Sequence, residues 1–183
     1  MSKYLVLLRG INVGGKNKIR MADLKSVLSE HGYLDVATYI ASGNVILESE
    51  KSEKMIQSEI ENLLSQNFHL DSDLIKVFIF TPEQIHKVVA NKPVGFGEQP
   101  DMYHSDVIFL RDISLDEAQK AFRPREGVDE IWSKNGVIYS QRLSAQRTKS
   151  RLSRIASTSQ YDFMTIRNWN TVNKLRELLN KGD

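Results

Sequence analysis

The fold of the first half follows from residues 36–47, VATYIASGNVIL. Two β-forming runs, Val36–Ile40 and Val45–Leu47, flank the turn Ser42-Gly43-Asn44. Short runs rich in β-formers on either side of a Gly-containing turn predict a β-hairpin.

The segments on either side of this hairpin each predict a strand and a helix. Tyr4–Leu8 is a continuous apolar run, typical of a strand buried on both faces, and Met21–Glu30 has helical apolar spacing that stops at Gly32. After the hairpin, Ser52 is placed to cap a second helix, and Lys76–Phe80 predicts the last strand. The order is therefore βαββαβ, which is the ferredoxin-like pattern.

The second half predicts a similar order with an additional helix at each end. Expected strands are Val107–Arg111, Val128–Trp132, Val137–Arg142 and, more irregularly, Asp162–Ile166. Expected helices start after Thr81 and Ser114, include Leu152, Ile155 and Ala156, and end with Asn168–Asn180. The fold class is α+β, with two ferredoxin-like (βαββαβ) subdomains at 1–81 and 82–183, antiparallel sheets with helices packed on one face, and an extra C-terminal helix.

Composition excludes several classes of protein. The 183 residues include no cysteine, which excludes disulfides and thiolate chemistry. No segment approaches the roughly 20 apolar residues of a membrane helix, and the first apolar run is too short for a signal peptide, so we expect a cytoplasmic protein.

The net charge of +2 is unevenly spread, at +5 over residues 1–25, −9 over 26–140 and +6 over 141–183. These basic ends form either a surface that attracts anions or ordinary solvated surface.

A glycine-rich loop follows the first strand and is the first candidate site. Gly10-Ile11-Asn12-Val13-Gly14-Gly15-Lys16-Asn17 spells G-x-x-x-x-G-K, but Asn17 stands where a phosphate-binding P-loop has Ser or Thr. The next helix is expected only near Met21, and the sheet is expected to be antiparallel, so nucleotide hydrolysis is disfavoured. Either the loop amides and Lys16 bind some other anion, or the glycines only provide a tight turn with positive φ.

A second candidate site lies at the expected start of the last helix. Arg167-Asn168-Trp169-Asn170-Thr171 combines a cation with unpaired helix amides, a plausible site for a carboxylate or phosphate. The alternative is a capped helix, with Asn168 or Thr165 as the cap and Trp169 as its anchor in the core.

The segment from Gln141 to Arg154 is a third candidate, with five Lys or Arg among serines. It is either a surface that binds nucleic-acid phosphates or the solvated face of one helix.

The first and third strands of the first half hold one aromatic residue, Tyr4, which argues against base stacking of the RNA-recognition kind. The four histidines have no metal-ligand spacing, so no metal and no cofactor is expected.

Three motifs carry a resemblance to a known family. The runs are Arg9-Gly10-Ile11-Asn12-Val13-Gly14-Gly15-Lys16-Asn17, Ser42-Gly43-Asn44-Val45 and Thr165-Ile166-Arg167-Asn168-Trp169-Asn170-Thr171-Val172. Across its length the chain resembles the bacterial family known as domain of unknown function 1697. The resemblance implies two ferredoxin-like subdomains and brings no activity, cofactor or catalytic residue. Thr148–Leu152 matches a basic, serine-rich stretch of the family only loosely, so no role is carried onto it.

Three functional hypotheses remain open from the sequence. The first is a binding protein for an anionic ligand (a nucleotide, a phosphorylated metabolite or nucleic acid), with a site formed by Arg9, Asn12, Gly14, Gly15, Lys16, Asn17, Asn44, Arg167, Asn168 and Thr171. The second is an enzyme for a phosphorylated or acyl substrate, with a carboxylate as base. The third is a protein-interaction module that uses the long loop Asn91–Ser105. The oligomeric state is left open.

Overall fold

The computed structural model describes residues 1–71 and 75–181. By packing, the chain divides into two units. The first contains Met1–Ile85 together with the chain from Leu175 onward, and the second contains His86–Lys174. The two units are described separately.

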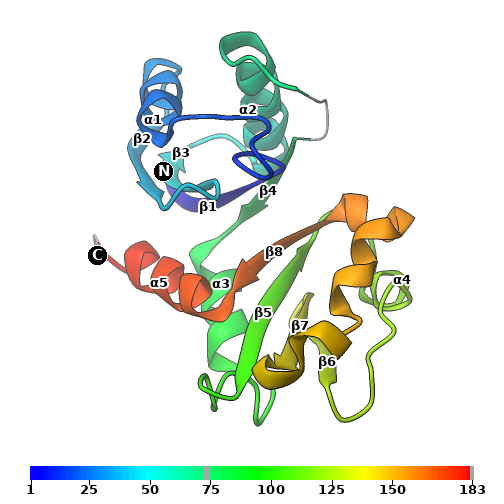
Figure 1. Ribbon diagram of the computed structural model, residues 1–183. Helices are drawn as coiled ribbons and strands as arrows, with labels where there is room; N and C mark the ends of the chain where they lie inside the picture. The colour runs from blue at the N-terminus through cyan, green and yellow to red at the C-terminus, as the bar shows by residue number, and fades with distance from the viewer. Residues whose placement is uncertain (72–74, 182–183) are drawn as a thin grey trace. The chain divides into compact units, whose positions relative to one another are not determined.

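The first unit has the βαββαβ order predicted from the hairpin at residues 36–47. Its elements are β1 (Ser2–Arg9), α1 (Met21–Glu30), β2 (Leu34–Tyr39), β3 (Asn44–Ser49), α2 (Glu53–Asn67) and β4 (Lys76–Phe80). The strands lie in the order β2-β3-β1-β4, and every neighbouring pair is antiparallel (Figure 1). This is the ferredoxin-like arrangement, in which two βαβ crossovers interleave.

Apolar side chains hold the first sheet to its two helices. Tyr4–Leu8 is buried throughout, as the continuous apolar run predicts. One face of β1 packs with Leu24 and Leu28 of α1 and with Ile56 and Ile60 of α2, the inward positions of both helices. The core of this unit therefore lies between the sheet and the α1–α2 layer, the two helices lying on one face of the sheet in Figure 1.

The second unit repeats the strand order of the first. Its sheet contains β5 (Tyr103–Leu110), β6 (Asp129–Lys134), β7 (Val137–Leu143) and β8 (Met164–Asn168), arranged as β6-β7-β5-β8 and antiparallel throughout. The β6–β7 turn contains Asn135 and Gly136 with φ of 56° and 78°, the positive values that an Asn-Gly hairpin turn requires. The fourth strand was expected at Asp162–Ile166 and lies two residues later.

The two crossovers of the second unit differ in kind. The first contains the short helix α4 (Leu115–Gln119), and the second contains only turns of 3-10 helix: η1 (Ser144–Lys149), η2 (Leu152–Ser157) and η3 (Ser159–Phe163). The expectation of one regular helix here is wrong. The segment is rich in serine and cations and has only Leu152 and Ile155 buried within η1–η3, too narrow an apolar stripe to hold an α-helix on the sheet.

Helices α3 (Pro82–Ala90) and α5 (Trp169–Leu179) are additional to the two ferredoxin-like patterns, and each includes residues of both units. Thr81 and Gln84 form a capping box at the predicted start of α3, with the Thr81 amide donating to Oε1 of Gln84 at 2.8 Å. Ser114 caps α4 as predicted, but the Glu117 carboxylate binds Lys120 and Gln160 and does not complete a box.

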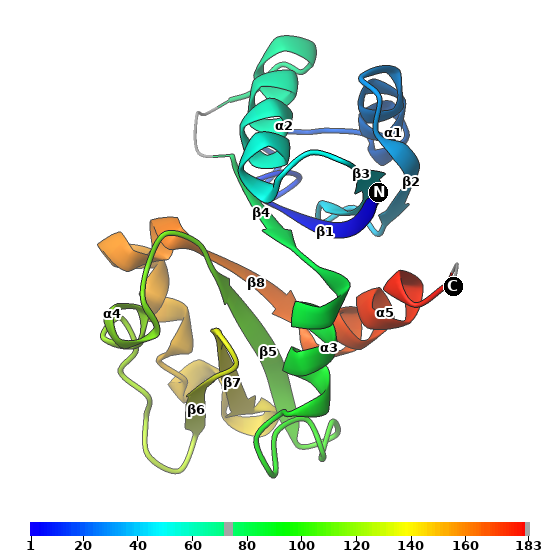
Figure 2. The same cartoon turned by 180° about the vertical axis from the view of Figure 1, so that it is seen from behind.

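The other face of the second sheet is covered by the loop that follows α3. Phe96 is fully buried and meets three rings edge-on, with centroid distances of 5.9 Å to Trp132, 5.0 Å to Tyr139 and 5.1 Å to Trp169. Tyr139 also donates its hydroxyl to the Val88 carbonyl of α3 at 2.7 Å. Figure 2 shows α3 leading into this loop. Because Phe96 is committed to packing within its own unit, it cannot anchor a partner protein, which weighs against the interaction-loop hypothesis.

Candidate functional site

The glycine-rich loop after β1 is a compact turn built from left-handed residues. Five of its residues have positive φ: Gly10 (87°), Asn12 (54°), Gly14 (59°), Gly15 (76°) and Asn17 (47°). Glycine and asparagine tolerate this conformation best, which explains the composition of the motif without a ligand. The predicted tight turn at Gly14 and Gly15 is confirmed. Since α1 begins at Met21 and the sheet is antiparallel, the context of a P-loop is absent from the described first unit.

Two asparagines hold the loop with their side chains. Asn12 donates from Nδ2 to the carbonyls of Ile19 and Ala41, at 2.9 and 2.8 Å, and accepts the Ile19 amide at Oδ1. Asn17 exchanges hydrogen bonds with Asp71, the Asn17 amide donating to Oδ2 at 2.6 Å and the Asp71 amide donating to Oδ1 of Asn17 at 2.7 Å. These polar groups, predicted as ligand contacts, are engaged in fixing the backbone. Lys16 is exposed, and Arg9 is half-buried at the end of β1, opposite Lys76.

The hairpin turn at Ser42-Gly43-Asn44 packs directly against this loop. The Gly43 carbonyl accepts the Leu8 amide at 2.8 Å, and a Cβ at Gly43 would lie 2.8 Å from Cβ of Leu8 and 2.9 Å from Cδ1 of Ile11. Asn44 is buried and donates from Nδ2 to the Tyr39 carbonyl and the Ser42 hydroxyl. The first two motifs therefore pack together through Gly43 and Ile11, while a shared ligand site that includes Asn44 stays a prediction.

The third motif lies in the second unit and has a mainly internal role. Arg167 is in β8, not at a helix start; it is buried, and its Nη1 donates to the Thr165 hydroxyl and the Ile166 carbonyl, each at 2.9 Å. Burial lowers the pKa of the Arg167 guanidinium to about 10. Asn168 accepts the Asn170 amide at 2.9 Å, so it caps α5 as predicted, and Trp169 packs on Phe96. Thr171 is half-buried in α5. A ligand site that combines the loop Arg9–Lys18 with Arg167–Thr171 would need residues of both units, and it stays a prediction.

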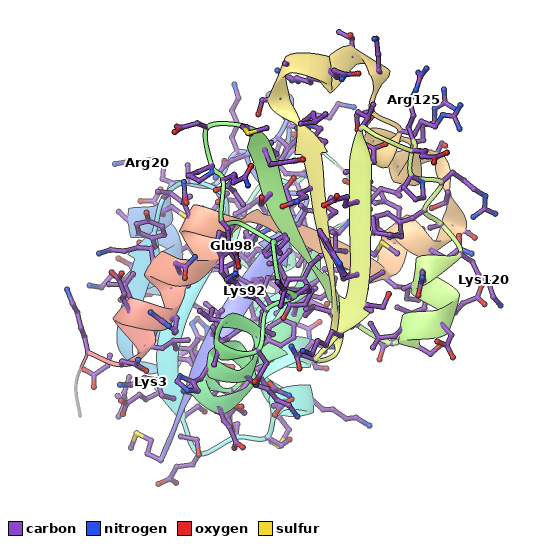
Figure 3. The ribbon with its side chains drawn as sticks, turned by 90° about the horizontal axis from the view of Figure 1, so that it is seen from below. Lys3, Arg20, Lys92, Glu98, Lys120 and Arg125 are labelled. Atoms are coloured by element: carbon purple, nitrogen blue, oxygen red, sulfur yellow. The ribbon has the colours of Figure 1, made fainter. Side chains whose placement is uncertain are left out.

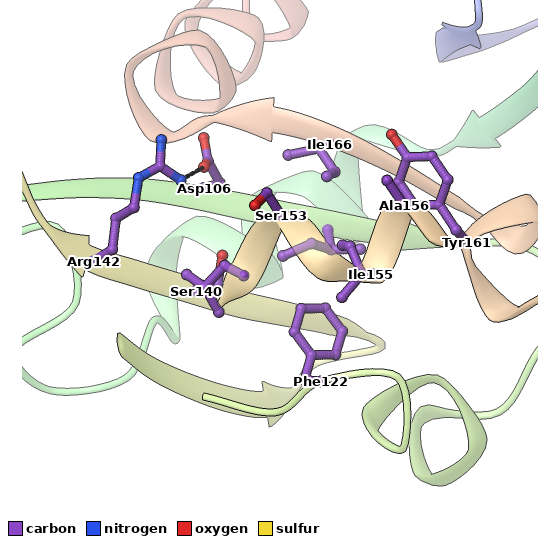
Figure 4. Close-up of a pocket in the computed structure, with 11 residues that line it drawn as sticks. Asp106, Phe122, Ser140, Arg142, Ser153, Ile155, Ala156, Tyr161 and Ile166 are labelled. Carbon is purple, nitrogen blue, oxygen red and sulfur yellow. Dashed lines mark ion pairs between the residues drawn. The ribbon is translucent and has the colours of Figure 1, made fainter. Parts of the chain in front are cut away.

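A cavity within the second unit lies under the irregular crossover, and the sequence did not predict it. It has a volume of about 260 Å³ and lies between the sheet and the turns η2 and η3 (Figure 4). Its apolar wall is made by Ile108, Phe122, Leu152, Ile155, Ala156 and Ile166, and its polar lining by Asp106, Ser140, Arg142, Ser153 and Tyr161. The cavity exists here because short 3-10 turns cover less of a sheet than the α-helix that fills the same place, as α2, in the first unit.

One end of the cavity carries a cluster of charges. Nη1 of Arg142 lies 4.0 Å from Oδ2 of Asp106, and Nε2 of His104 lies 3.2 Å from the same oxygen. In Figure 4 the Arg142–Asp106 pair is at one end of the cavity and Tyr161 is at the other. Burial raises the pKa of the Asp106 carboxyl above its usual value, against the opposing effects of His104 and Arg142. A proton on Asp106 therefore leaves the positive charge of Arg142 without a neutralising carboxylate in this cluster.

The hydroxyl of Ser140 is the buried polar group that faces this cavity. Ser140 is only 4% exposed, and its side chain forms no hydrogen bond with the described residues. Most buried hydroxyls have a partner, so this one is available to a polar group that enters the cavity. Ser140 and Arg142 lie two residues apart in β7 and therefore face the same side of the sheet, toward the cavity. This pair of inward polar residues is the sequence signal that could have indicated the site.

A smaller polar hollow lies further along β5 in the same unit. Its volume is about 120 Å³, and it is lined by Gly97, Pro100, Tyr103, His104, Ser105, Asn168, Trp169 and Asn170. Of the predicted site residues, Asn168 is thereby brought beside His104, the residue that also touches Asp106. In the part of the chain that the structure describes, no group of His, Asp and Glu is arranged to hold a metal ion, and no helix is long and apolar enough to cross a membrane.

Comparisons with known proteins support the fold and the family. The model of the family described as "Protein of unknown function (DUF1697)" matches residues 1–139. The conserved bacterial protein SP0830 from Streptococcus pneumoniae has a similar solved structure, with a TM-score of 0.80 at 24% identity over 98% of this chain and 99% of that one. No curated protein matches the sequence. The likeness to SP0830 shows the two-unit α+β fold and nothing of function.

Proposed function

Since this chain belongs to the DUF1697 family, whose description assigns no activity, we propose from its geometry that the second unit binds a small organic anion. The apolar part of the ligand lies among Phe122, Ile155 and Ile166, and its acidic group binds Arg142. The observation that supports this most directly is the combination, in one cavity, of an apolar wall with Arg142 and the available hydroxyl of Ser140.

The chemistry of Arg142 favours a carboxylate or phosphate over a neutral ligand. A guanidinium presents a planar fork of donors that matches both groups. Asp106 engages it at 4.0 Å, a distance longer than a direct hydrogen bond, and the Arg142 side chain is 21% exposed. An anion can therefore replace or share this contact. The volume of about 260 Å³ is just below the roughly 300–1,000 Å³ of typical ligand sites, so the ligand is small.

Thermal unfolding in the presence of matched compounds tests this proposal. Benzoate, phenyl phosphate and hexanoate present an apolar body with an acidic group, and phenol presents the ring without the charge. At a hundred times its dissociation constant a ligand adds about 2.7 kcal/mol, which for a chain of this size raises the midpoint by roughly 5–10 °C. We expect a shift with at least one of the anions and none with phenol. No shift with any of them, or an equal shift with phenol, contradicts the proposal.

Two pairs of variants locate the binding. Arg142→Gln should abolish the shift, whereas Lys134→Gln, which removes the same charge from the exposed hairpin turn of the same unit, should not. Ala156→Phe places a ring at the cavity lining, whereas Ala145→Phe places it on the exposed turn η1 outside the lining. Loss of binding in Ala156→Phe alone supports the cavity; equal loss in both pairs places the binding elsewhere.

Catalysis on the same ligand is a second candidate function, and Asp106 is the residue that favours it. A half-buried carboxyl with a raised pKa that lines a cavity is a typical general acid or base. If the protein converts its ligand, Asp106→Asn should abolish turnover and leave binding at Arg142 measurable. If Asp106→Asn leaves any turnover unchanged, Asp106 has no catalytic role.

A further inference from the structure

We propose that the second unit also binds the phosphate backbone of nucleic acid, on an exposed surface distinct from the cavity. This basic surface is formed by Arg125, Arg147, Lys149, Arg151 and Arg154. All five side chains are exposed, and they come from the loop before β6 and from the crossover η1–η2.

The five cations have no acidic partner in their own unit. Two other cations of the unit are paired with acids, with Nζ of Lys92 at 2.8 Å from Glu98 and Nζ of Lys120 at 2.7 Å from Glu117. In contrast, no side chain of the basic surface forms an ion pair or a hydrogen bond with any residue that the structure describes. The one exposed acid in residues 123–127 and 144–158 is Glu126. Unneutralised positive charge of this kind is what a polyanion requires.

A buried carboxylate holds the two parts of the basic surface together. Oδ2 of Asp129 accepts the backbone amides of both Arg125 and Arg151, at 2.9 and 2.8 Å. Asp129 is 6% exposed, and its other oxygen has no hydrogen-bond partner among the described residues. This clamp fixes the two backbones side by side, which lowers the cost of ordering the basic segments for a ligand. Figure 3 labels Arg125, beside η1 and η2.

The spacing within the crossover adds further donors. Turns close between the Ser150 amide and the Arg147 carbonyl and between the Arg154 amide and the Arg151 carbonyl, so each turn ends on or near a cation. Thr148, Ser150 and Ser153 lie between the cations along the chain. Arginine forks and hydroxyls are the usual donors to phosphate oxygens in complexes with nucleic acid.

A nucleic acid fits this surface better than an anionic membrane does. Peripheral membrane binding needs apolar side chains that enter the lipid as well as charge. The large apolar residues exposed in the described chain are Met1, Val13, Leu34, Ile40, Met55, Val94 and Met102, and none belongs to the segments of the basic surface. These segments also lack an aromatic ring for base stacking, so we expect backbone recognition with little sequence preference.

This inference is independent of the small-anion proposal. None of the five residues lines the cavity, although Leu152, Ser153 and Ile155 of the same crossover do. Failure of one proposal therefore leaves the other intact.

Fluorescence anisotropy with the full chain and labelled oligonucleotides tests the proposal. The probes are oligo(dT) and oligo(U) of about 20 nucleotides, longer than the roughly 4–16 that a small domain covers. Titrations run between about 50 and 200 mM salt, where five phosphate contacts to a single strand give a slope of log K against log salt of about −3.5. No binding at the lowest salt overturns the proposal.

Matched double variants assign the binding to this surface. Arg151→Gln with Arg154→Gln should make the slope about 1.4 less steep, because about 0.7 is lost for each phosphate contact. Lys87→Gln with Lys134→Gln removes the same charge from exposed positions elsewhere in the unit and should leave the slope unchanged. An equal loss in both double variants overturns the assignment. Binding to phosphatidylglycerol vesicles without binding to either oligonucleotide identifies a membrane surface instead, and also overturns the proposal.

Discussion

The imidazole of His104 and the carboxylate of Asp106 lie 3.2 Å apart on the same face of β5, between Nε2 and Oδ2. His104 lines the smaller hollow and Asp106 lines the cavity, so this pair stands between the two. Protonation of Asp106 therefore changes the charge next to both spaces.

Asp106→Asn should change how stability depends on pH. Burial raises the pKa of this carboxyl above its usual 3.8, so the folded state keeps the proton at pH values where the unfolded chain has lost it. The contribution of Asp106 to the free energy of unfolding is therefore fully present below pH 3.8, and it is lost as the pH rises through the pKa of this carboxyl in the folded state. The variant should lack this decline, as measured by urea unfolding at several pH values. Asp112→Asn, at a side chain that is 70% exposed, is the control; identical profiles for the two variants would contradict the expectation.

Gly97→Ala should destabilise the second unit more than Gly95→Ala. Both glycines have positive φ, +68° and +86°, so both substitutions incur about 1–2 kcal/mol of backbone strain. A Cβ at Gly97 would also lie 2.5 Å from Nε1 of Trp169, whereas at Gly95 it meets nothing within 4 Å. Overpacking adds about 1–3 kcal/mol. Urea unfolding followed by tryptophan fluorescence measures the difference, and equal losses would show that the contact with Trp169 is unimportant.

Asn12→Asp should destabilise the first unit strongly, while Lys16→Ala should not. An aspartate would place an oxygen where Nδ2 of Asn12 now donates to the carbonyls of Ile19 and Ala41. Because both carbonyls lose their donor, the free energy of unfolding should fall by about 2–4 kcal/mol. Lys16 is exposed in the same loop, so its truncation should stay within about 0.5 kcal/mol. If Lys16→Ala instead removes binding of an anion, the loop is a ligand site as well as a structural turn.

Tyr139→Phe should cost about 1–3 kcal/mol, because the Val88 carbonyl would lose its donor inside the protein. The hydroxyl also accepts Nδ2 of Asn135 at 3.0 Å, which ties the hairpin turn to the same point. Burial raises the pKa of the Tyr139 phenol, so the donor is retained at ordinary pH. Tyr103→Phe is the matched control, since the Tyr103 hydroxyl has no hydrogen bond among the described residues. A similar loss in both variants would indicate a general effect of removing a hydroxyl.

The sequence predicts the first unit well because each of its elements has its own local signal. α1 and β4 occupy the predicted residues, Met21–Glu30 and Lys76–Phe80, since apolar spacing and turn residues delimit both. The crossover after β7 was predicted as regular helix because Leu152 and Ile155, three residues apart, suit a 3-10 turn as well as an α-helix. Sequence pattern alone does not separate these two cases.

The candidate site was less predictable than the fold. The motifs that are most distinctive in sequence, around Asn12 and Asn44, owe their composition to backbone geometry and internal hydrogen bonds. The cavity forms because 3-10 turns, and not an α-helix, cross over the sheet after β7. No single residue of the sequence indicates this empty space. Only Ser140 and Arg142, polar at inward positions of a strand, gave a local sign of it.

The first unit is completed by a segment that follows the whole second unit in the chain. Residues from Leu175 onward pack with Met1–Ile85, and Nζ of Lys3 reaches the carbonyl of Leu179 at 3.2 Å. During translation, the whole of His86–Lys174 must therefore emerge before this contact can form. The nascent first unit has to wait, with this part of its surface uncovered, until synthesis reaches α5.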